Sequence, residues 1–238
     1  MHQGVSLPLR GPKPTTLLAA LLLANGNVVS TERLIHILWP YHAPNTATAL
    51  IHTYISTLRK ILRANTGRNG PNIFTQAPGY RLETGDSQVD LLEFNTVSNK
   101  ARKAYDANQT ADAAVLAEHA LKLRRGPVLG GAVGEYMAIE VARIDELILS
   151  IEELRAAAHI SQGNAAAIVP TLMSLVDENP LRETFRGQLM VALSQVGNIP
   201  GALRAYRQGY TMMVDELGIQ PGAQLRAIHE SLLRTSAL

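Results

Sequence analysis

From residue 90 to its end, the chain shows one helical pattern after another. Apolar residues recur there at the spacing of helix turns, and no stretch alternates as a half-buried strand does. Glycine, proline and asparagine separate the patterns, as they commonly do where helices stop. The sequence therefore predicts seven helices, over residues 90–107, 110–125, 135–162, 164–179, 181–196, 200–216 and 222–235.

Two of the breaks between these helices recur at a fixed interval. Gly163-Asn164 and Gly197-Asn198 lie 34 residues apart, which is the length of a tetratricopeptide repeat. In such arrays, pairs of antiparallel helices stack and bury a common core. We expect residues 90–238 to form an all-α domain that resembles a tetratricopeptide array.

The part of the chain before residue 86 contains three shorter helical patterns. The first covers residues 13–24. The second begins after Ser30, whose side chain suits a helix N-cap, and ends at Pro40. The third runs from about residue 45 to residue 63, with apolar residues along one side.

A hairpin follows the third helix. Residues 73–75 and 80–82 flank Gln76-Ala77-Pro78-Gly79, which predicts two strands joined by a tight turn. Residues 5–9 alternate weakly, and the proline at position 8 limits them to an edge strand. Three helices and a hairpin are the order of a winged helix-turn-helix. We therefore predict a mainly α protein in which residues 1–86 form a winged-helix domain with a truncated N-terminal sheet.

The two predicted domains differ in charge, although the formal net charge of the chain is only +2. Residues 1–81 hold eight Lys and Arg and a single acid, Glu32, which sums to +7. The remaining residues hold 14 bases and 19 acids, which sums to −5. This distribution indicates that the basic part binds a polyanion such as nucleic acid, with a solvated basic surface as the alternative.

The third helix has two contrasting faces. When each residue turns by 100°, its large apolar residues and Ala47 gather within about 40° of one direction and predict the buried face. The opposite face is small, polar and basic and has no carboxylate, which suits the floor of a DNA major groove. The candidate DNA-binding residues are those of this face and its approach, with one cation of the hairpin: Asn45, Thr46, Ala49, His52, Thr53, Ser56, Arg59, Lys60, Arg63 and Arg81.

These candidates have different expected roles, each with a plainer alternative. The arginines and lysine of the helix either contact phosphates or are free surface cations. Its histidine, threonine and serine either approach base edges or are simply solvated. Arg81, close to the hairpin tip, either enters the minor groove or belongs to a structural turn.

Several segments of the first part resemble a known family. They are similar to the OmpR-type winged helix of the Streptomyces antibiotic regulatory proteins (the SARP family). The end of the third helix and the hairpin are shared with OmpR-type response regulators in general. The matching segments are Gly11-Pro12-Lys13, the leucine-rich residues 17–23, Val28-Val29-Ser30, Leu38-Trp39, residues 54–60 and Pro78-Gly79-Tyr80-Arg81-Leu82.

The second part resembles the bacterial transcriptional activation domain of the same regulators. The matching segments are Asp90-Leu91-Leu92-Glu93-Phe94, Asn179-Pro180-Leu181-Arg182-Glu183, Gly187-Gln188-Leu189-Met190, residues 202–206 and residues 215–222. The resemblance implies a transcriptional activator that binds direct repeats near promoters of an antibiotic (secondary-metabolite) gene cluster. It also implies a homodimer, or a dimer that forms on DNA, and contact with the sigma or alpha subunits of RNA polymerase. The family normally has several strands before the first helix, whereas about ten residues precede it here.

The sequence gives no support for an enzyme. The chain has no cysteine, which excludes a thiol nucleophile and a cysteine-ligated metal. Its seven histidines are scattered singly, and Gly130–Gly134 follows a helix without the spacing of a phosphate-binding loop. We expect neither a metal nor a cofactor.

The alternative to a DNA-binding activator is a helical-repeat scaffold with a degenerate N-terminal domain. The few residues before the first helix favour the scaffold, whereas the carboxylate-free helix face and the uneven charge oppose it. The longest apolar run, residues 17–24, is far too short to cross a membrane, and no signal-peptide cleavage site follows it. We expect a cytoplasmic protein associated with the nucleoid.

Overall fold

The computed structural model describes residues 7–66 and 69–235. Contacts divide the chain into two compact units. The first unit consists of the chain up to Glu93 together with Leu123–Leu147, and the second of Phe94–Lys122 together with everything from Ile148 onward. The segment from 123 to 147 therefore packs with the winged-helix part, although the sequence places it in the helical domain. The predicted boundaries of the functional domains, 1–86 and 90–238, stay a prediction.

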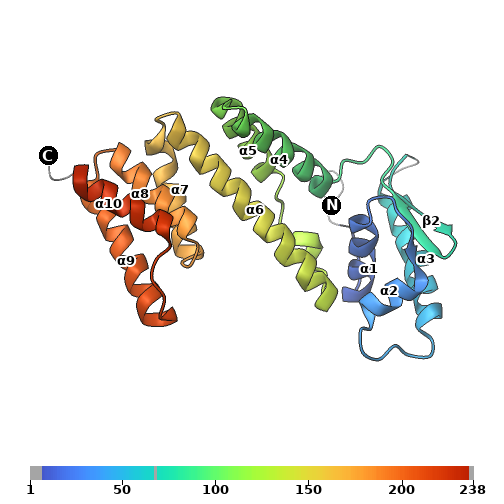
Figure 1. Cartoon of the computed structure of the whole chain (residues 1–238). Helices are drawn as coiled ribbons and strands as arrows, with labels where there is room; N and C mark the ends of the chain where they lie inside the picture. The colour runs from blue at the N-terminus through green and yellow to red at the C-terminus, as the bar shows by residue number, and fades with distance from the viewer. Residues whose placement is uncertain (1–6, 67–68, 236–238) are drawn as a thin grey trace. The chain divides into compact units, whose positions relative to one another are not determined.

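The part of the first unit before residue 84 is built from α1, α2, α3 and a small sheet (Figure 1). The predicted order of three helices and a hairpin is confirmed. Ser30 caps the second helix as predicted, because its side chain accepts a hydrogen bond from the Arg33 amide at 3.1 Å. The third helix begins two residues later than predicted and ends three residues later. The elements are α1 (Pro12–Leu23), β1 (Val29–Ser30), α2 (Thr31–Leu38), α3 (Ala47–Thr66), β2 (Asn72–Gln76) and β3 (Gly79–Glu83).

The sheet has three antiparallel strands in the order β1-β3-β2. The predicted hairpin is present, whereas β1 was not predicted because two residues are too few to show alternation. Gly79 pairs with Ser30, and a Cβ at Gly79 would overlap the Val29 carbonyl oxygen. Residues 7–9 form no strand, which corrects part of the predicted strand 5–9, and residues 5 and 6 lie outside the described part.

The core of the first unit includes residues from the segment after position 123. Leu17, Leu34 and Ile51 of the three helices are fully buried, and so is Met137 near the start of α6 (Glu135–Ser161). The Thr16 hydroxyl donates to the Val133 carbonyl at 3.0 Å and accepts from the Val133 amide at 3.1 Å. A short 3₁₀ turn, η1 (Val128–Gly131), leads into this contact.

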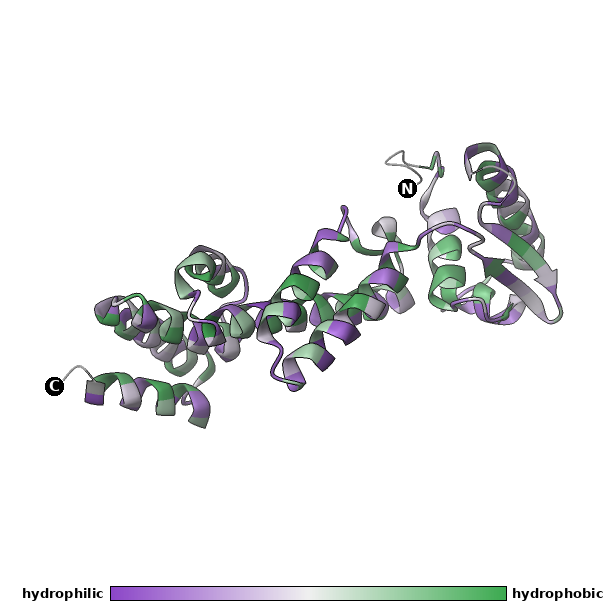
Figure 2. Cartoon of the chain, turned by 90° about the horizontal axis from the view of Figure 1, so that it is seen from above, coloured by the Kyte–Doolittle hydropathy of each residue, from purple (hydrophilic) through white to green (hydrophobic). Residues whose placement is uncertain are grey.

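The helices after residue 90 match the predicted ones to within three residues at each end. The first turn of α4 and the first half of α6 belong to the first unit, and the rest belong to the second. Figure 2 shows that hydrophobic and hydrophilic residues lie on different sides of these helices. Besides α6, they are α4 (Asp90–Asp106), α5 (Thr110–Lys122), α7 (Ala165–Glu178), α8 (Glu183–Gln195), α9 (Ile199–Leu217) and α10 (Ala223–Thr235).

The core of the second unit is centred on α8, which packs against α7, α9 and α10. Phe185 and Met190 of α8 are fully buried. The two turns at the predicted 34-residue interval have the same geometry, since Gly163 and Gly197 have φ values of 72° and 80°. Only glycine adopts this left-handed conformation at little cost, which explains the recurrence of glycine at the two turns.

Candidate nucleic-acid interface

The third helix, α3, separates its residues as its sequence predicts. Ala47, Ile51, Ile55, Leu58 and Leu62 are buried against the first unit's core. The opposite face is exposed, and it includes every candidate residue of the helix except Arg59, which is half-buried. The exposed candidates are Ala49, His52, Thr53, Ser56, Lys60 and Arg63.

The polar residues at the middle of α3 are ordered by local contacts. The Thr53 hydroxyl donates to the Ala49 carbonyl at 3.0 Å, and the Thr57 hydroxyl donates to the Thr53 carbonyl at 2.9 Å. The proton of each hydroxyl therefore points at the helix backbone, while its oxygen can still accept. The His52 ring meets the Tyr80 ring edge-on, with 6.4 Å between centroids. This surface offers hydroxyl acceptors, an imidazole and small apolar groups, which are the kinds of group that can contact base edges.

Arg59 joins α3 to the hairpin. Its Nε donates to the Ile73 carbonyl at 2.7 Å, and its Nη2 donates to the Thr75 hydroxyl at 2.8 Å. These bonds fix the angle between the helix and β2. Sequence patterns gave no sign of them, because the partners are 14 and 16 residues away.

Arg81 lies within β3 and not at the tip of the hairpin, which is formed by Ala77 and Pro78. Its Nη2 pairs with Glu83 at 2.5 Å, and its guanidinium lies over the Phe74 ring at 5.8 Å. The exposed tip, from Gln76 to Pro78, carries no charge. The cation that the sequence suggested for the tip is thus held along the side of the hairpin.

Asn45 and Thr46 precede the helix, where the sequence predicts them inside it or at its start. Both are exposed, and the helix backbone begins with the bond from the Ala47 amide to the Pro44 carbonyl at 2.8 Å. The amide groups of the first turn face this approach, which gives it partial positive charge. A helix N-terminus of this kind is suited to bind a phosphate.

The exposed face of α3 is electropositive. The helix contains no carboxylate, and Lys60 and Arg63 make no ion pair in the described part of the chain. Glu83, the acid on the hairpin, already pairs with Arg81. A polyanion at this face would meet two unpaired cations and no acid on the helix.

Comparison with protein families assigns both parts of the chain. Residues 7–82 match the family described as "Transcriptional regulatory protein, C terminal", and residues 89–233 match the "Bacterial transcriptional activator domain". The second match covers more than half of the chain. The chain belongs to the Streptomyces antibiotic regulatory protein family. This regulator is a DNA-binding transcriptional activator and not an enzyme, and the assignment opposes the scaffold interpretation.

Named relatives are similar to this regulator over nearly its whole length. The "Transcriptional regulatory protein MoaR1" of Mycobacterium tuberculosis is 33% identical, over 98% of this chain and 75% of the relative. The "Regulatory protein AfsR" of Streptomyces coelicolor is 32% identical, over 98% of this chain but 23% of the relative. A solved structure of M. tuberculosis EmbR, in complex with a low-affinity phosphopeptide, matches with a TM-score of 0.88 and 32% identity. That match covers 98% of this chain and 62% of EmbR.

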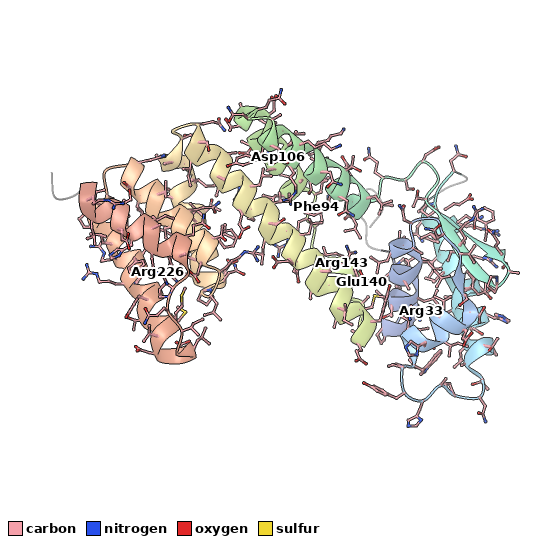
Figure 3. The ribbon with its side chains drawn as sticks, in the orientation of Figure 1. Arg33, Phe94, Asp106, Glu140, Arg143 and Arg226 are labelled. Carbon is pink, nitrogen blue, oxygen red and sulfur yellow. The ribbon has the colours of Figure 1, made fainter. Side chains whose placement is uncertain are left out.

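The charged residues of α6 form ion pairs rather than a catalytic cluster. Arg143 pairs with Glu140 at 3.0 Å (Figure 3), and Arg155 pairs with Glu152 at 2.6 Å, both at the i,i+3 spacing that the sequence indicates. Within residues 7–66 and 69–235, no group of His, Asp or Glu is arranged to hold a metal ion. No helix in this part is long and apolar enough to cross a membrane.

Proposed function

We propose that the regulator activates a secondary-metabolite gene cluster by binding direct repeats near its promoters as a dimer. In this proposal α3 lies in the major groove and the helical part contacts RNA polymerase, in the cytoplasm at the nucleoid. The observation that supports it most is the exposed, carboxylate-free face of α3, held by a fully buried opposite face. Because phosphate contacts supply much of the affinity for DNA, an exposed face with cations and no carboxylate is suited to a duplex.

The exposure and contacts of the candidate residues support a different role for each group of them. Lys60 and Arg63, which are exposed and unpaired, are assigned to phosphates. His52, Thr53 and Ser56 are assigned to base edges. Arg59, which joins the helix to the hairpin, and Arg81, which contacts Glu83 and Phe74 within the hairpin, are assigned to shaping the surface. The remaining candidates, Asn45, Thr46 and Ala49, are assigned to contacts between the start of α3 and the DNA backbone.

The functional domains are proposed to follow the sequence rather than the packing. Residues 1–86 would supply all DNA contacts, and residues 90–238 would supply contacts to the transcription machinery. Residues 123–147 would then have a supporting role, since they pack with the DNA-binding part.

The first experiment is selection of sheared genomic DNA by the purified protein at low and moderate salt, followed by sequencing. We expect enrichment of a few intergenic sites that contain a spaced repeat and survive moderate salt. Weak, uniform recovery that disappears with salt would contradict the proposal, because non-specific binding is almost entirely electrostatic.

Substitutions then separate phosphate contacts from base contacts. Lys60→Ala should weaken binding to all sequences alike and reduce the slope of log K against log salt by about one. Thr53→Ala and Ser56→Ala should instead change the preferred sequence while leaving the slope unchanged. Lys122→Ala, an exposed lysine at the end of α5, is the matched control and should change neither. An unchanged slope for Lys60→Ala would contradict the placement of α3.

A further inference from the structure

Two exposed surfaces of the second unit are complementary in charge, and both carry apolar residues. We propose that they bind each other between two copies of the regulator placed head to tail on DNA. The inference rests on the proposed binding to direct repeats and names the surfaces that join neighbouring copies.

The first surface is a basic groove between α4 and α5, with a volume of about 520 Å³. Lys100 and Lys103 line it from one face of α4, and neither makes an ion pair or hydrogen bond in the described part of the chain. Asp112 is the one acid among its lining residues. The groove also contains Val115, whose side chain is 67% exposed. An acidic partner with an apolar side chain would fit this groove.

The lysines of the second unit are concentrated here. Of the five lysines in the chain, Lys100, Lys103 and Lys122 are the three after residue 90, and all lie on α4 or α5. Several other cations of this unit already have partners, such as Arg155 with Glu152 and Arg182 with Glu153. The lysines of the unit are therefore a local feature of this surface.

The second surface is the acidic end of α9. Asp215 and Glu216 are exposed and make no ion pair in the described part of the chain. Leu217 and Ile219 beside them are 48% and 54% exposed, although both are large and apolar. The helix stops at Gly218, in the left-handed conformation, and the Ile219 amide bonds back to the Met213 carbonyl at 3.1 Å. The apolar side chains are thus presented on an ordered helix end.

The two surfaces do not meet within one chain. Figure 1 shows the end of α9 well apart from α4 and α5. The lysines of the groove match the carboxylates of the helix end, and Val115 offers an apolar contact for Leu217 or Ile219. A second copy of the regulator therefore supplies to each surface what the chain itself leaves uncovered.

Direct repeats constrain the kind of contact that two neighbouring copies can make. Two copies bound to repeats in the same direction have the same orientation along the DNA, so no two-fold axis relates them. A two-fold interface pairs a surface with itself, whereas a head-to-tail interface pairs two different surfaces. A basic groove and an acidic helix end are two different surfaces, so they satisfy the second condition, and the common direction of the repeats excludes a two-fold arrangement of the same pair. Because each surface is small, we expect the contact to form when adjacent repeats hold the copies at high effective concentration.

Charge reversal tests the pairing with the full chain. Binding is measured on DNA with one repeat and on DNA with two, and the ratio of affinities gives the cooperativity. Lys100→Glu/Lys103→Glu should lose cooperativity by about tenfold or more, within the usual range of coupling between sites. Asp215→Lys/Glu216→Lys should lose it equally, and the variant with all four substitutions should regain it. Affinity for a single repeat should be unchanged throughout.

Controls separate this contact from general effects of charge. Arg204→Glu/Arg207→Glu reverses two exposed cations at the same i,i+3 spacing on α9 and should leave cooperativity intact. Thermal melting of every variant verifies its fold.

The inference is overturned if the variant with all four substitutions is no more cooperative than either double variant, or if the control loses as much cooperativity as they do. It also falls if the natural chain binds two repeats without cooperativity, or if the lysine variant weakens binding to one repeat. Absence of preference for repeats over scrambled DNA would instead contradict the proposed function.

Disulfide crosslinking provides a second test, because the chain has no cysteine. Lys103→Cys and Asp215→Cys proteins are mixed on two-repeat DNA under mild oxidation. We expect a crosslinked dimer from the mixture and from a chain with both substitutions, but from neither single variant alone. A crosslink between two copies of the Lys103→Cys protein alone would indicate a two-fold contact and overturn the inference.

Discussion

The buried guanidinium of Arg186 holds three parts of the second unit together. Its Nη1 donates to the Ala205 carbonyl of α9 at 3.0 Å, and its Nη2 donates to the Pro180 carbonyl before α8 at 3.2 Å. Burial lowers the pKa of this arginine, while the charges of Asp177 and Glu183 oppose that shift. The space that the side chain occupies exists because residue 209 of α9 is a glycine.

Gly209→Ala tests this arrangement. In an open helix the change would stabilise by about 1 kcal/mol, since glycine is a poor helix former. Here the new Cβ would overlap the Cδ and Nε of Arg186, so we expect the free energy of unfolding to fall by about 1–3 kcal/mol in urea titration. The loss should shrink in an Arg186→Met background, where a flexible side chain can move aside. An increase in stability in the natural background would contradict the prediction, because it would show that α8 and α9 move apart at no cost to accommodate the new Cβ.

Tyr206 makes stability depend on pH above the neutral range. Its ring stacks on His229 with 3.8 Å between centroids, and burial, opposed by the charge of Arg226, raises its pKa above the ordinary 10.0. The folded protein therefore holds the phenol proton more firmly than the unfolded chain. The resulting contribution to the free energy of unfolding is fully present below pH 10.0, the pKa in the unfolded chain. It is lost as the pH rises through the higher pKa of the folded protein. Urea titrations from pH 8 upward should show a steeper decline for the natural chain than for Tyr206→Phe, and equal slopes would contradict the prediction.

At the scale of elements, the start of α6 completes the core of the first unit. Met137 is fully buried there in a core cluster that includes residues of the first three helices and the hairpin, whereas Ile139, two residues further, is 63% exposed. Met137→Ala should lower the free energy of unfolding by about 2–5 kcal/mol and weaken DNA binding near the melting temperature. Ile139→Ala is the matched control and should change stability by less than about 0.5 kcal/mol. Equal effects would mean that α6 does not support the core.

The helix α3 and the hairpin illustrate how one element depends on another. The faces of α3 follow from the spacing of its own residues, so the sequence predicted them correctly. The role of Arg59 does not, because its partners belong to β2. A side chain that the sequence indicates as a phosphate contact or a free surface cation thus also connects α3 to β2.

At the scale of the whole molecule, the packing units cross the order of the sequence. The first unit needs residues 123–147, including Val133 and its two bonds to Thr16. A fragment that ends at Glu93 lacks them, and the apolar side of α1 loses its cover. We expect this fragment to melt at a lower temperature than the first transition of the full chain and to bind a hydrophobic dye. A synthetic peptide of residues 123–147 should raise the melting temperature, and a fragment as stable as the full chain would contradict the packing.

Local sequence was sufficient for the helices, the hairpin, the Ser30 cap, the two glycine turns and the polar face of α3. These features depend on residues within a few positions of one another, where periodicity and capping act directly. Tertiary structure alone decided the two-residue strand β1, the bridging role of Arg59, the pair between Arg182 and Glu153, and the membership of residues 123–147. Each of these joins residues that are distant in the chain, and a contact of that kind leaves no periodic signal in either segment.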